Sequence, residues 1–342
     1  MATRDQVAKL AGVAPSSVSY VMSNKRKVSE ATRTKVLAAI RELNYHPNYM
    51  AGALSTGQSK IVAVSSPLDN VKDLQIYNEY VAGIVEAASE NDFLALIVPD
   101  QTMLESVRLQ SFLDSRIMAG FILVGASKQD MFTKKLVANE YPYVSVGHTS
   151  QQKTLRGVSV DLYQAASSAI DILKTQGHKK IAVIVSDEMP KSFLVEARRL
   201  EVELLIFRTE NSVLAGRALA ERIIAENLDL TAVICLISQA NVGFRQHWDF
   251  IFGRLTTKAL SYISVGSTSE MGSHLTAQVS RVSFDFRAIG REAFEQLISN
   301  LGKDNYQPVK ISWKASYFQG STVSAPRDRP LSNFYNVKEN YS

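Results

Sequence analysis

The chain has 342 residues, of which 46% are hydrophobic and 21% are charged, a composition typical of a globular protein with a sizeable core. The N-terminal residues contain no apolar signal-like region and no apolar run reaches 18 residues, so we expect neither a secretory signal nor a membrane span. The only cysteine, Cys235, excludes an internal disulfide framework. It stands in the apolar run TAVICLI, where we expect a buried thiol in a reduced, cytoplasmic setting.

The positive charge is concentrated near the N-terminus. The whole chain carries a formal charge of +5. Within residues 1–60, nine basic residues stand against three acidic ones, which leaves +6 there and −1 for the other 282 residues. A basic segment on a near-neutral body indicates a polyanionic partner such as nucleic acid, with a merely solvated charged surface as the alternative.

The first 45 residues predict three short helices. Thr3 can cap a first helix, and Gly12 suits the left-handed exit from it. Pro15 is a favourable first residue for a second helix, and Ser29 can cap a third. The helices are expected over residues 4–10, from residue 15 onward and over residues 30–43. Helical spacing predicts an inward-facing set made of Val7, Leu10, Ala11, Val18, Val21, Met22, Val36, Ile40 and Leu43.

The glycine-bearing turn between the first two helices indicates a helix-turn-helix, a motif that places its second helix in the DNA major groove. The segment PSSVS at residues 15–19 gives the exposed face of that helix small side chains, so that the helix can approach base edges and phosphates closely. A three-helix bundle that binds no nucleic acid is the alternative. The basic loop SNKRK and the charge excess favour DNA binding.

The run VAxLAGVxxxxVSxVxxxxxxVSxxTRxKVxxAIxxLNYxPN, from Val7 to Asn48, resembles the DNA-binding head of the lactose-repressor (LacI/GalR) family. The resemblance implies that Pro15, Ser16 and Tyr20 read bases. It implies phosphate contacts for Thr3, Ser17, Ser19, Asn24, Ser29 and Tyr45. This chain departs from the family at Ala14, where many members carry a capping serine, a loss of about 1 kcal/mol of helix stability.

Residues 48–60, NYMAGALSTGQSK, read as a linker. The resemblance implies instead a short hinge helix on DNA, with Asn48, Ala51 and Leu54 in the minor groove. Leu54 would then act as the apolar wedge, which costs a few kcal/mol of base stacking and bends the duplex. An ordinary linker is the alternative.

The remainder of the chain alternates short apolar runs with amphipathic stretches, which predicts the α/β class. The pattern restarts near residue 161, so we expect two doubly wound parallel-sheet subdomains, a core that resembles periplasmic sugar-binding proteins. Helices are expected over residues 74–90, 162–176, 212–227 and 286–301, and a strand is expected near 309–319. The expected domains are a head at 1–47, a hinge at 48–60 and a core at 61–342, with an N-subdomain at about 61–160 and 286–318 and a C-subdomain at about 161–285 and 319–342.

Ligands of such folds bind outside the carboxyl ends of the strands, which here means the cleft between the subdomains. Position implies that the cleft presents Ile76, Tyr77, Asp161, Arg198, Ser238, Gln239, Trp248 and Thr268. Ser238 and Gln239 stand where the family usually has an Asn-Asp pair, and Thr268 stands where it usually has an Asp. Several of the residues that typically contact the sugar are therefore replaced in this chain. Trp248 fits packing better than a role as a sugar platform.

These observations predict a sequence-specific DNA-binding transcriptional regulator, a repressor of carbohydrate-metabolism genes. We expect a homodimer on a pseudo-palindromic operator, joined along residues 74–90 and 286–301, and a small carbohydrate effector. A response to a protein partner or a non-sugar metabolite stays open. The five histidines lack metal spacing and no glycine-rich phosphate loop is present, so we expect no metal, no cofactor, no catalysis and no membrane partner.

Overall fold

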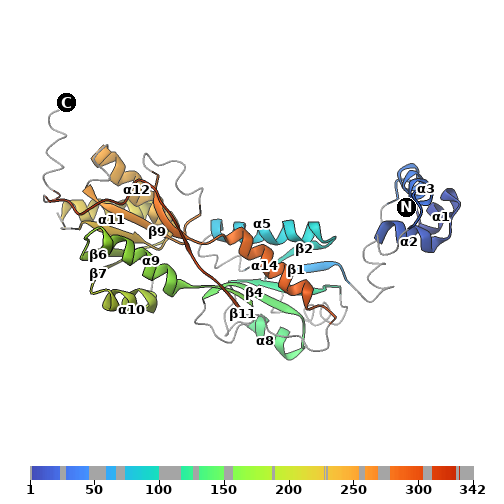
Figure 1. The fold of residues 1–342 in the computed structure, drawn as a ribbon, viewed down its shortest axis with the longest axis horizontal. Coiled ribbons are helices and arrows are strands. Elements are labelled where there is room, and N and C mark those ends of the chain that lie inside the picture. The colour runs from blue at the N-terminus through green and yellow to red at the C-terminus, as the bar shows by residue number, and fades with distance from the viewer. Residues whose placement is uncertain are drawn as a thin grey trace. The chain divides into compact units, whose positions relative to one another are not determined.

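The computed structural model contains two compact units, a three-helix head and a larger α/β core, each of which is described by itself (Figure 1). No helix in the described part of the chain is long and apolar enough to cross a bilayer. The structure describes residues 2–23, 28–45, 59–66, 74–99, 117–125, 131–149, 157–186, 189–226, 228, 230–253, 259–268, 278–302, 310–328 and 331.

The head consists of α1 (Arg4–Ala11), α2 (Pro15–Ser23) and α3 (Glu30–Glu42). Thr3 and Gln6 form a capping box at the start of α1, in which each side chain accepts a hydrogen bond from the other's backbone N–H. Gly12 ends α1 in the left-handed conformation, with φ of 66°, and its N–H donates to the carbonyls of Ala8 and Lys9. Ser29 caps α3 by accepting from the N–H of Thr32. The sequence therefore predicted the caps and the turn of the head correctly.

A small apolar core holds the three helices of the head together. It is narrower than predicted, because Leu10 and Met22 are 46% and 36% exposed. Helices this short bury only a thin stripe each, and both residues lie at the flank of that stripe. The buried residues are Val7, Ala8, Ala11, Val18, Val21, Val36 and Ala39, and the partly buried ones packed against them are Val13, Val28, Ile40, Leu43 and Tyr45.

The core unit begins with a six-stranded sheet, the first sheet, in which every pair is parallel. Its strand order is β11-β5-β4-β3-β1-β2. The strands are β1 (Ile61–Ser66), β2 (Leu94–Pro99), β3 (Gly120–Val124), β4 (Tyr143–Thr149), β5 (Gly157–Val160) and β11 (Lys310–Trp313). The central strand β3 is fully buried, which explains its unbroken apolar sequence.

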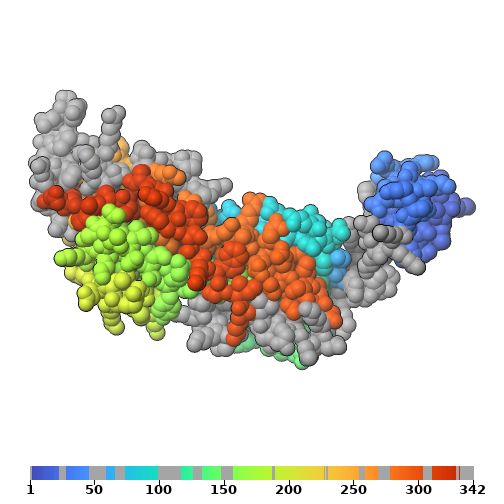
Figure 2. Space-filling view, viewed as in Figure 1, coloured from blue at the N-terminus to red at the C-terminus, as the bar shows by residue number. Residues whose placement is uncertain are grey.

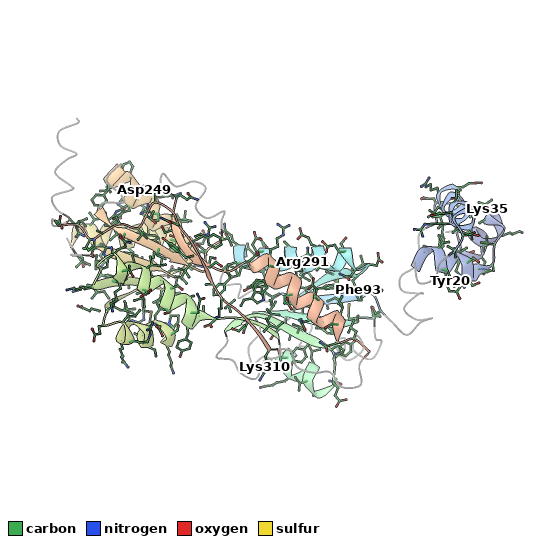
Figure 3. The ribbon with its side chains drawn as sticks, viewed as in Figure 1. Tyr20, Lys35, Phe93, Asp249, Arg291 and Lys310 are labelled. Carbon is green, nitrogen blue, oxygen red and sulfur yellow. The ribbon has the colours of Figure 1, made fainter. Side chains whose placement is uncertain are left out.

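Helices α5 (Leu74–Glu90) and α14 (Phe286–Ser299) pack against each other beside the first sheet, as the cyan and orange surfaces in Figure 2 show. Arg287 pairs with Glu86, and Arg291 pairs with Glu90 at 2.5 Å (Arg291 is labelled in Figure 3). A shorter helix, α8, spans Met131–Ala138. The two long helices were predicted as a dimer interface; these ion pairs join the helices within one chain, and the interface stays a prediction.

A second six-stranded sheet has the order β12-β10-β9-β8-β6-β7 and is parallel except at β12. Its strands are β6 (Lys180–Val185), β7 (Glu203–Arg208), β8 (Ala232–Cys235), β9 (Ser261–Val265), β10 (Ser280–Ser283) and β12 (Ser316–Phe318). Its helices are α9 (Leu162–Thr175), α10 (Lys191–Arg199), α11 (Val213–Ala225) and α12 (Ser238–Phe252). The expected α/β architecture with two parallel-sheet layers is confirmed.

The second sheet is covered by helices on both faces. Helices α11 and α12 share a core with alternate residues of β6 and β8, while α9 and α10 contact β9, β10 and β7 (Figure 1). Within the shared core, Trp248 stacks on Phe244 at 5.5 Å and also contacts Phe252 at 4.6 Å. Arg245 is wholly buried there, donates to Asp249 at 2.8 Å and lies over the ring of Tyr262.

The chain crosses from one sheet to the other between β5 and α9, between β10 and α14, and between β11 and β12. The single strand expected near 309–319 is therefore two strands in two different sheets. Gln164 on α9 fixes the break, because its amide donates to the carbonyl of Ala315 at 3.1 Å and accepts from the N–H of Ala315 at 2.7 Å. The backbone between Trp313 and Ser316 cannot continue either ladder while it makes these bonds.

A buried histidine anchors the segment after β12. Nδ1 of His178 lies 2.9 Å from the hydroxyl of Thr231, and Nε2 lies 2.9 Å from the carbonyl oxygen of Ser324. The carbonyl can only accept, so Nε2 carries the proton and Nδ1 accepts from the hydroxyl. Burial lowers the pKa of His178 below its usual value, which favours this neutral form.

Candidate nucleic-acid interface and ligand cavity

The first turn of α2 is the most exposed part of the predicted recognition helix. Pro15 and Ser16 are exposed, whereas Ser17, Ser19 and Tyr20 are half-buried (Tyr20 is labelled in Figure 3). The hydroxyl of Ser19 donates to the carbonyl of Pro15 at 3.3 Å. Pro15 and Ser16 are therefore the side chains of this helix best placed to meet a base edge, with Tyr20 one turn further along.

The start of α2 has no capping side chain at the preceding residue. Ala14 offers only its carbonyl, which accepts from the N–H groups of Ser17 at 2.8 Å and Val18 at 3.4 Å. A helix N-terminus carries a partial positive charge and free N–H groups, which attract phosphate. The loss of the usual capping serine therefore weakens the helix while leaving that end accessible to an anion.

The other predicted phosphate contacts are spread over the head. Thr3 and Ser29 are engaged as helix caps, and Tyr45 packs against the apolar core with its N–H on the carbonyl of Ile40. Arg4 reaches α2 by donating to Ser19 at 3.5 Å. Exposed cations on the head are Arg4, Lys9, Lys35 and Arg41. Asn24 and the hinge residues Asn48, Ala51 and Leu54 lie outside the described residues.

The core unit contains a cavity of about 320 Å³ that both sheets line. It lies at the carboxyl ends of the strands, where Gly147 of β4, Val160 of β5, Val185 of β6 and Val265 of β9 reach it. The first turns of α5, α9, α10, α12 and α14 also border it. This is the place that the parallel-sheet rule predicts for a ligand, and the volume is at the lower end of the usual range for small-molecule sites.

Two of the eight predicted cleft residues, Ile76 and Ser238, line this cavity. Tyr77 and Thr268 are buried next to lining residues, and neither hydroxyl has a hydrogen-bond partner in the described structure. Tyr77 follows Ile76 by one residue and therefore points to a different side of α5.

The other four predicted cleft residues have structural positions elsewhere. Asp161 caps α9 by accepting from the N–H of Gln164 at 3.0 Å, and its neighbours line the cavity instead. Arg198 is exposed near the far end of α10, whose first turn borders the cavity. The N–H of Gln239 is held by the side chain of Asn211. Trp248 is ten residues, or roughly 15 Å, beyond Ser238 along α12 and belongs to the apolar core.

Sequence reasoning missed Asn241 and the aromatic residues of the cavity wall. Asn241 lies three residues after Ser238, so the two side chains share the cavity face of α12. The sequence would have predicted this shared face if the start of α12 at Ser238 had been known. The aromatic lining residues are Tyr80, Phe193, Phe284 and Phe286; each lies within a turn of a strand end or in the first two turns of a helix, positions that the sequence did not single out.

The cavity is uncharged. None of its lining residues in the described part of the chain is Asp, Glu, Lys or Arg. Burial raises the pKa of the Cys235 thiol to about 11 and also raises the pKa of Tyr80, so both remain protonated at neutral pH. Within the described residues, no cluster of histidine, cysteine and carboxylate side chains is suited to a metal ion.

Residues 3–48 match the family model of bacterial regulatory proteins, lacI family. The head of this chain is therefore of the lacI-family type. The HTH-type transcriptional regulator MalR of Streptococcus pneumoniae is 30% identical over 185 residues, which cover 53% of this chain and 56% of MalR. The chain thus spans about half the length of the curated relatives it matches.

Solved LacI-family structures share the fold over nearly the whole chain. The lac repressor dimer bound to operator and the anti-inducer ONPF has a TM-score of 0.71 at 21% identity, covering 95% of this chain and 99% of that one. A complex of the transcriptional regulator CelR with cellobiose has a TM-score of 0.65 at 20% identity, covering 94% and 100%.

Proposed function

We propose that this LacI-family chain is a sequence-specific DNA-binding transcriptional regulator, acting as a repressor of carbohydrate-metabolism genes. The observation that carries the proposal is the head: residues 3–48 match the family model, and the described helices form a helix-turn-helix whose second helix has an exposed first turn. Pro15, Ser16 and Tyr20 would read bases, while Thr3, Ser17, Ser19, Asn24, Ser29 and Tyr45 would contact phosphates. Function on chromosomal DNA places the protein in the cytoplasm.

The regulator would act as a homodimer on a pseudo-palindromic operator, like the solved lac repressor dimer. Apolar side chains support an interface at the edge of the first sheet. Leu94, Leu96 and Ile97 of the edge strand β2 are exposed, as are Leu74 and Val85 of α5. An exposed apolar edge strand is a ready site for pairing with another chain, and contiguous exposed apolar patches mark interaction surfaces.

A small molecule in the cavity would control operator affinity. The cavity lies where ligands of parallel-sheet folds bind, and CelR was solved with cellobiose, which supports a sugar or sugar derivative as effector. Ile76 and Ser238 would contact it directly. The function is binding alone, and we expect no turnover of the effector.

Selection of sheared genomic DNA on the purified protein at fixed, near-physiological salt tests the proposal, because nonspecific binding depends steeply on salt. We expect an enriched pseudo-palindrome with two half-sites. Leu54→Ala should then weaken operator binding and leave nonspecific binding intact, whereas Leu214→Ala, a surface change in the core at a 78% exposed residue, should leave both unchanged. Retention of unselected DNA alone would contradict the proposal, and unchanged operator affinity of Leu54→Ala would contradict the wedge role.

A further inference from the structure

Two buried polar side chains in the cavity lack partners. Ser238 and Asn241 are 6% and 3% exposed and both line the cavity. The hydroxyl oxygen of Ser238 and the amide oxygen of Asn241 have no hydrogen-bond partner in the part of the chain that the structure describes. Buried polar groups in native proteins are nearly always hydrogen-bonded, so this pair marks a place where a ligand completes the structure.

Three serine side chains at the strand ends of the second sheet are already hydrogen-bonded within the protein. The hydroxyls of Ser264 and Ser267 lie 2.6 Å apart and bond to each other, and the hydroxyl of Ser283 donates to the carbonyl of Ser267. The thiol of Cys235 donates to the carbonyl of Ile237 at 3.4 Å. Among the described lining residues, Ser238 and Asn241 are those whose buried side-chain oxygen atoms lack a hydrogen-bond partner.

A large part of the remaining wall is apolar and partly aromatic. Tyr80 meets Phe286 edge to face at 5.4 Å between ring centroids, and Phe284 meets Phe286 at 5.9 Å. Phe193 of α10 and Ile76 of α5 add further apolar surface. Flat apolar groups pack well against such rings, because aromatic pairs gain from offset or edge-to-face contact.

These walls discriminate between ligand classes. A charged ligand would lose its hydration without meeting an opposite charge among the described lining residues. An unsubstituted sugar carries hydroxyls all around the edge of its ring, and each one buried against an apolar wall without a partner weakens binding. A ligand that combines a small hydroxyl-bearing part with a flat apolar part satisfies both sides of the cavity.

We propose that the effector is an uncharged sugar derivative with a flat apolar substituent, in chemical terms an aryl glycoside. Its hydroxyls bond to Asn241 and Ser238, and its substituent packs against Tyr80, Phe193 and Phe286. The inference rests on the proposed function in that the cavity is taken as the effector site. It narrows the carbohydrate class to derivatives less polar than the free sugar.

Matched glycosides test the class of ligand. Isothermal titration of the full-length protein would compare the methyl and phenyl β-glycosides of glucose, galactose and xylose, together with the free sugars and their phosphates. We expect, for at least one sugar, a phenyl glycoside that binds at least tenfold more tightly than its methyl counterpart, equal to about 1.4 kcal/mol. Equal or tighter binding by the methyl glycoside, the free sugar or the phosphate, or no binding by any phenyl glycoside, would overturn the proposal.

Substitution of the unpartnered amide tests the contact itself. Asn241→Leu keeps the number and branching of the side-chain heavy atoms and removes the unsatisfied group, so we expect an unchanged or raised Tm of the free protein and at least a tenfold loss of phenyl glycoside affinity. The matched control is Ser192→Ala, since Ser192 also buries an unpartnered hydroxyl but does not line the cavity. It should change the Tm and leave the affinity alone. The milder Ser238→Ala gives the same test if the leucine variant does not fold, and wild-type affinity in the folded variant would overturn the proposal.

Operator binding, read separately by gel shift, keeps the two proposals distinguishable. Phenyl glycoside binding that depends on Asn241, without any operator binding, would overturn the proposed function and support the cavity inference. Operator binding with no affinity for the phenyl glycosides would do the reverse.

Discussion

Gly83→Ala is the sharpest test of the packing that builds one side of the cavity. Gly83 lies where α5 crosses α14, and a Cβ there would stand 1.9 Å from the carbonyl oxygen of Arg287. A Cβ at Gly290 would stand 2.2 Å from the carbonyl oxygen of Tyr80, so the backbones of α5 and α14 are in close contact at both glycines. Since non-bonded carbon atoms rest about 3.5–4.0 Å apart, the helices would have to separate by on the order of 1–2 Å.

Two effects of opposite sign compete in this variant. Helix propensity favours alanine over glycine by about 1 kcal/mol. Overpacking typically costs about 1–3 kcal/mol, and here the obstacle is backbone, which cannot rotate away as a side chain can. We therefore expect a net loss of about 1–2 kcal/mol in the free energy of unfolding. We also expect weaker glycoside binding in the cavity, because Tyr80 and Phe286 line it and lie on the two helices that are pushed apart.

Urea unfolding of the full-length protein, followed by circular dichroism, measures the change. The matched control is Ser89→Ala on the exposed part of α5, where propensity acts alone and a gain of a few tenths of a kcal/mol is expected. Glycoside titration of the same variant reports on the cavity. A Gly83→Ala protein that is as stable as the wild type would refute the close helix contact as the reason for glycine.

Other consequences of the structure can be tested as directly. Because burial lowers the pKa of His178 in the fold, its contribution to stability is present above the unfolded pKa of about 6.5 and falls as the pH drops below it; the pH dependence of urea midpoints should flatten in His178→Gln, and an unaltered profile would count against it. Thr3→Ala should cost the head about 1 kcal/mol, seen as faster hydrogen exchange in head peptides only, whereas Thr34→Ala within α3 should slow exchange slightly; equal effects would argue against capping. Arg245→Leu should destabilise the core by about 3–5 kcal/mol, and adding Asp249→Leu should recover part of the loss in a double-mutant cycle; additive losses would show that the buried pair is not coupled.

The sequence predicted helices well where strong periodicity met clear ends. The helix expected over residues 74–90 is found at Leu74–Glu90, and the first head helix ends at the predicted glycine. The prediction of a single strand near residues 309–319 was wrong, since this segment forms two strands that belong to different sheets. No glycine or proline marks the break, which depends on the amide of Gln164, a residue 151 positions away. Local patterns cannot reveal a break that a distant side chain imposes.

The sequence predicted the location of the cavity but not the chemical character of its walls. The carboxyl ends of parallel strands located it, and Ile76 and Ser238 followed from position. Asn241 was missed because a polar residue in the first turn of a helix is ordinarily exposed, and only the packing of α12 in the core unit buries it. Trp248 was placed in the cleft by position, although the packing alternative proved right, since the helix carries it into the core.

The walls of the cavity also explain how an occupant can act on the whole core unit. Val160 and Leu162 flank one crossing between the sheets, and Phe284 and Phe286 flank another; all four line the cavity. A molecule there touches the two sheets and the segments that join them, so its binding free energy depends on how the sheets are placed relative to each other. By linkage, occupancy must bias that placement by the same free energy. An apolar ligand suits this role, because its favourable contacts scale with the wall area that both sheets bring around it, whereas its hydrogen bonds to Asn241 engage α12 alone.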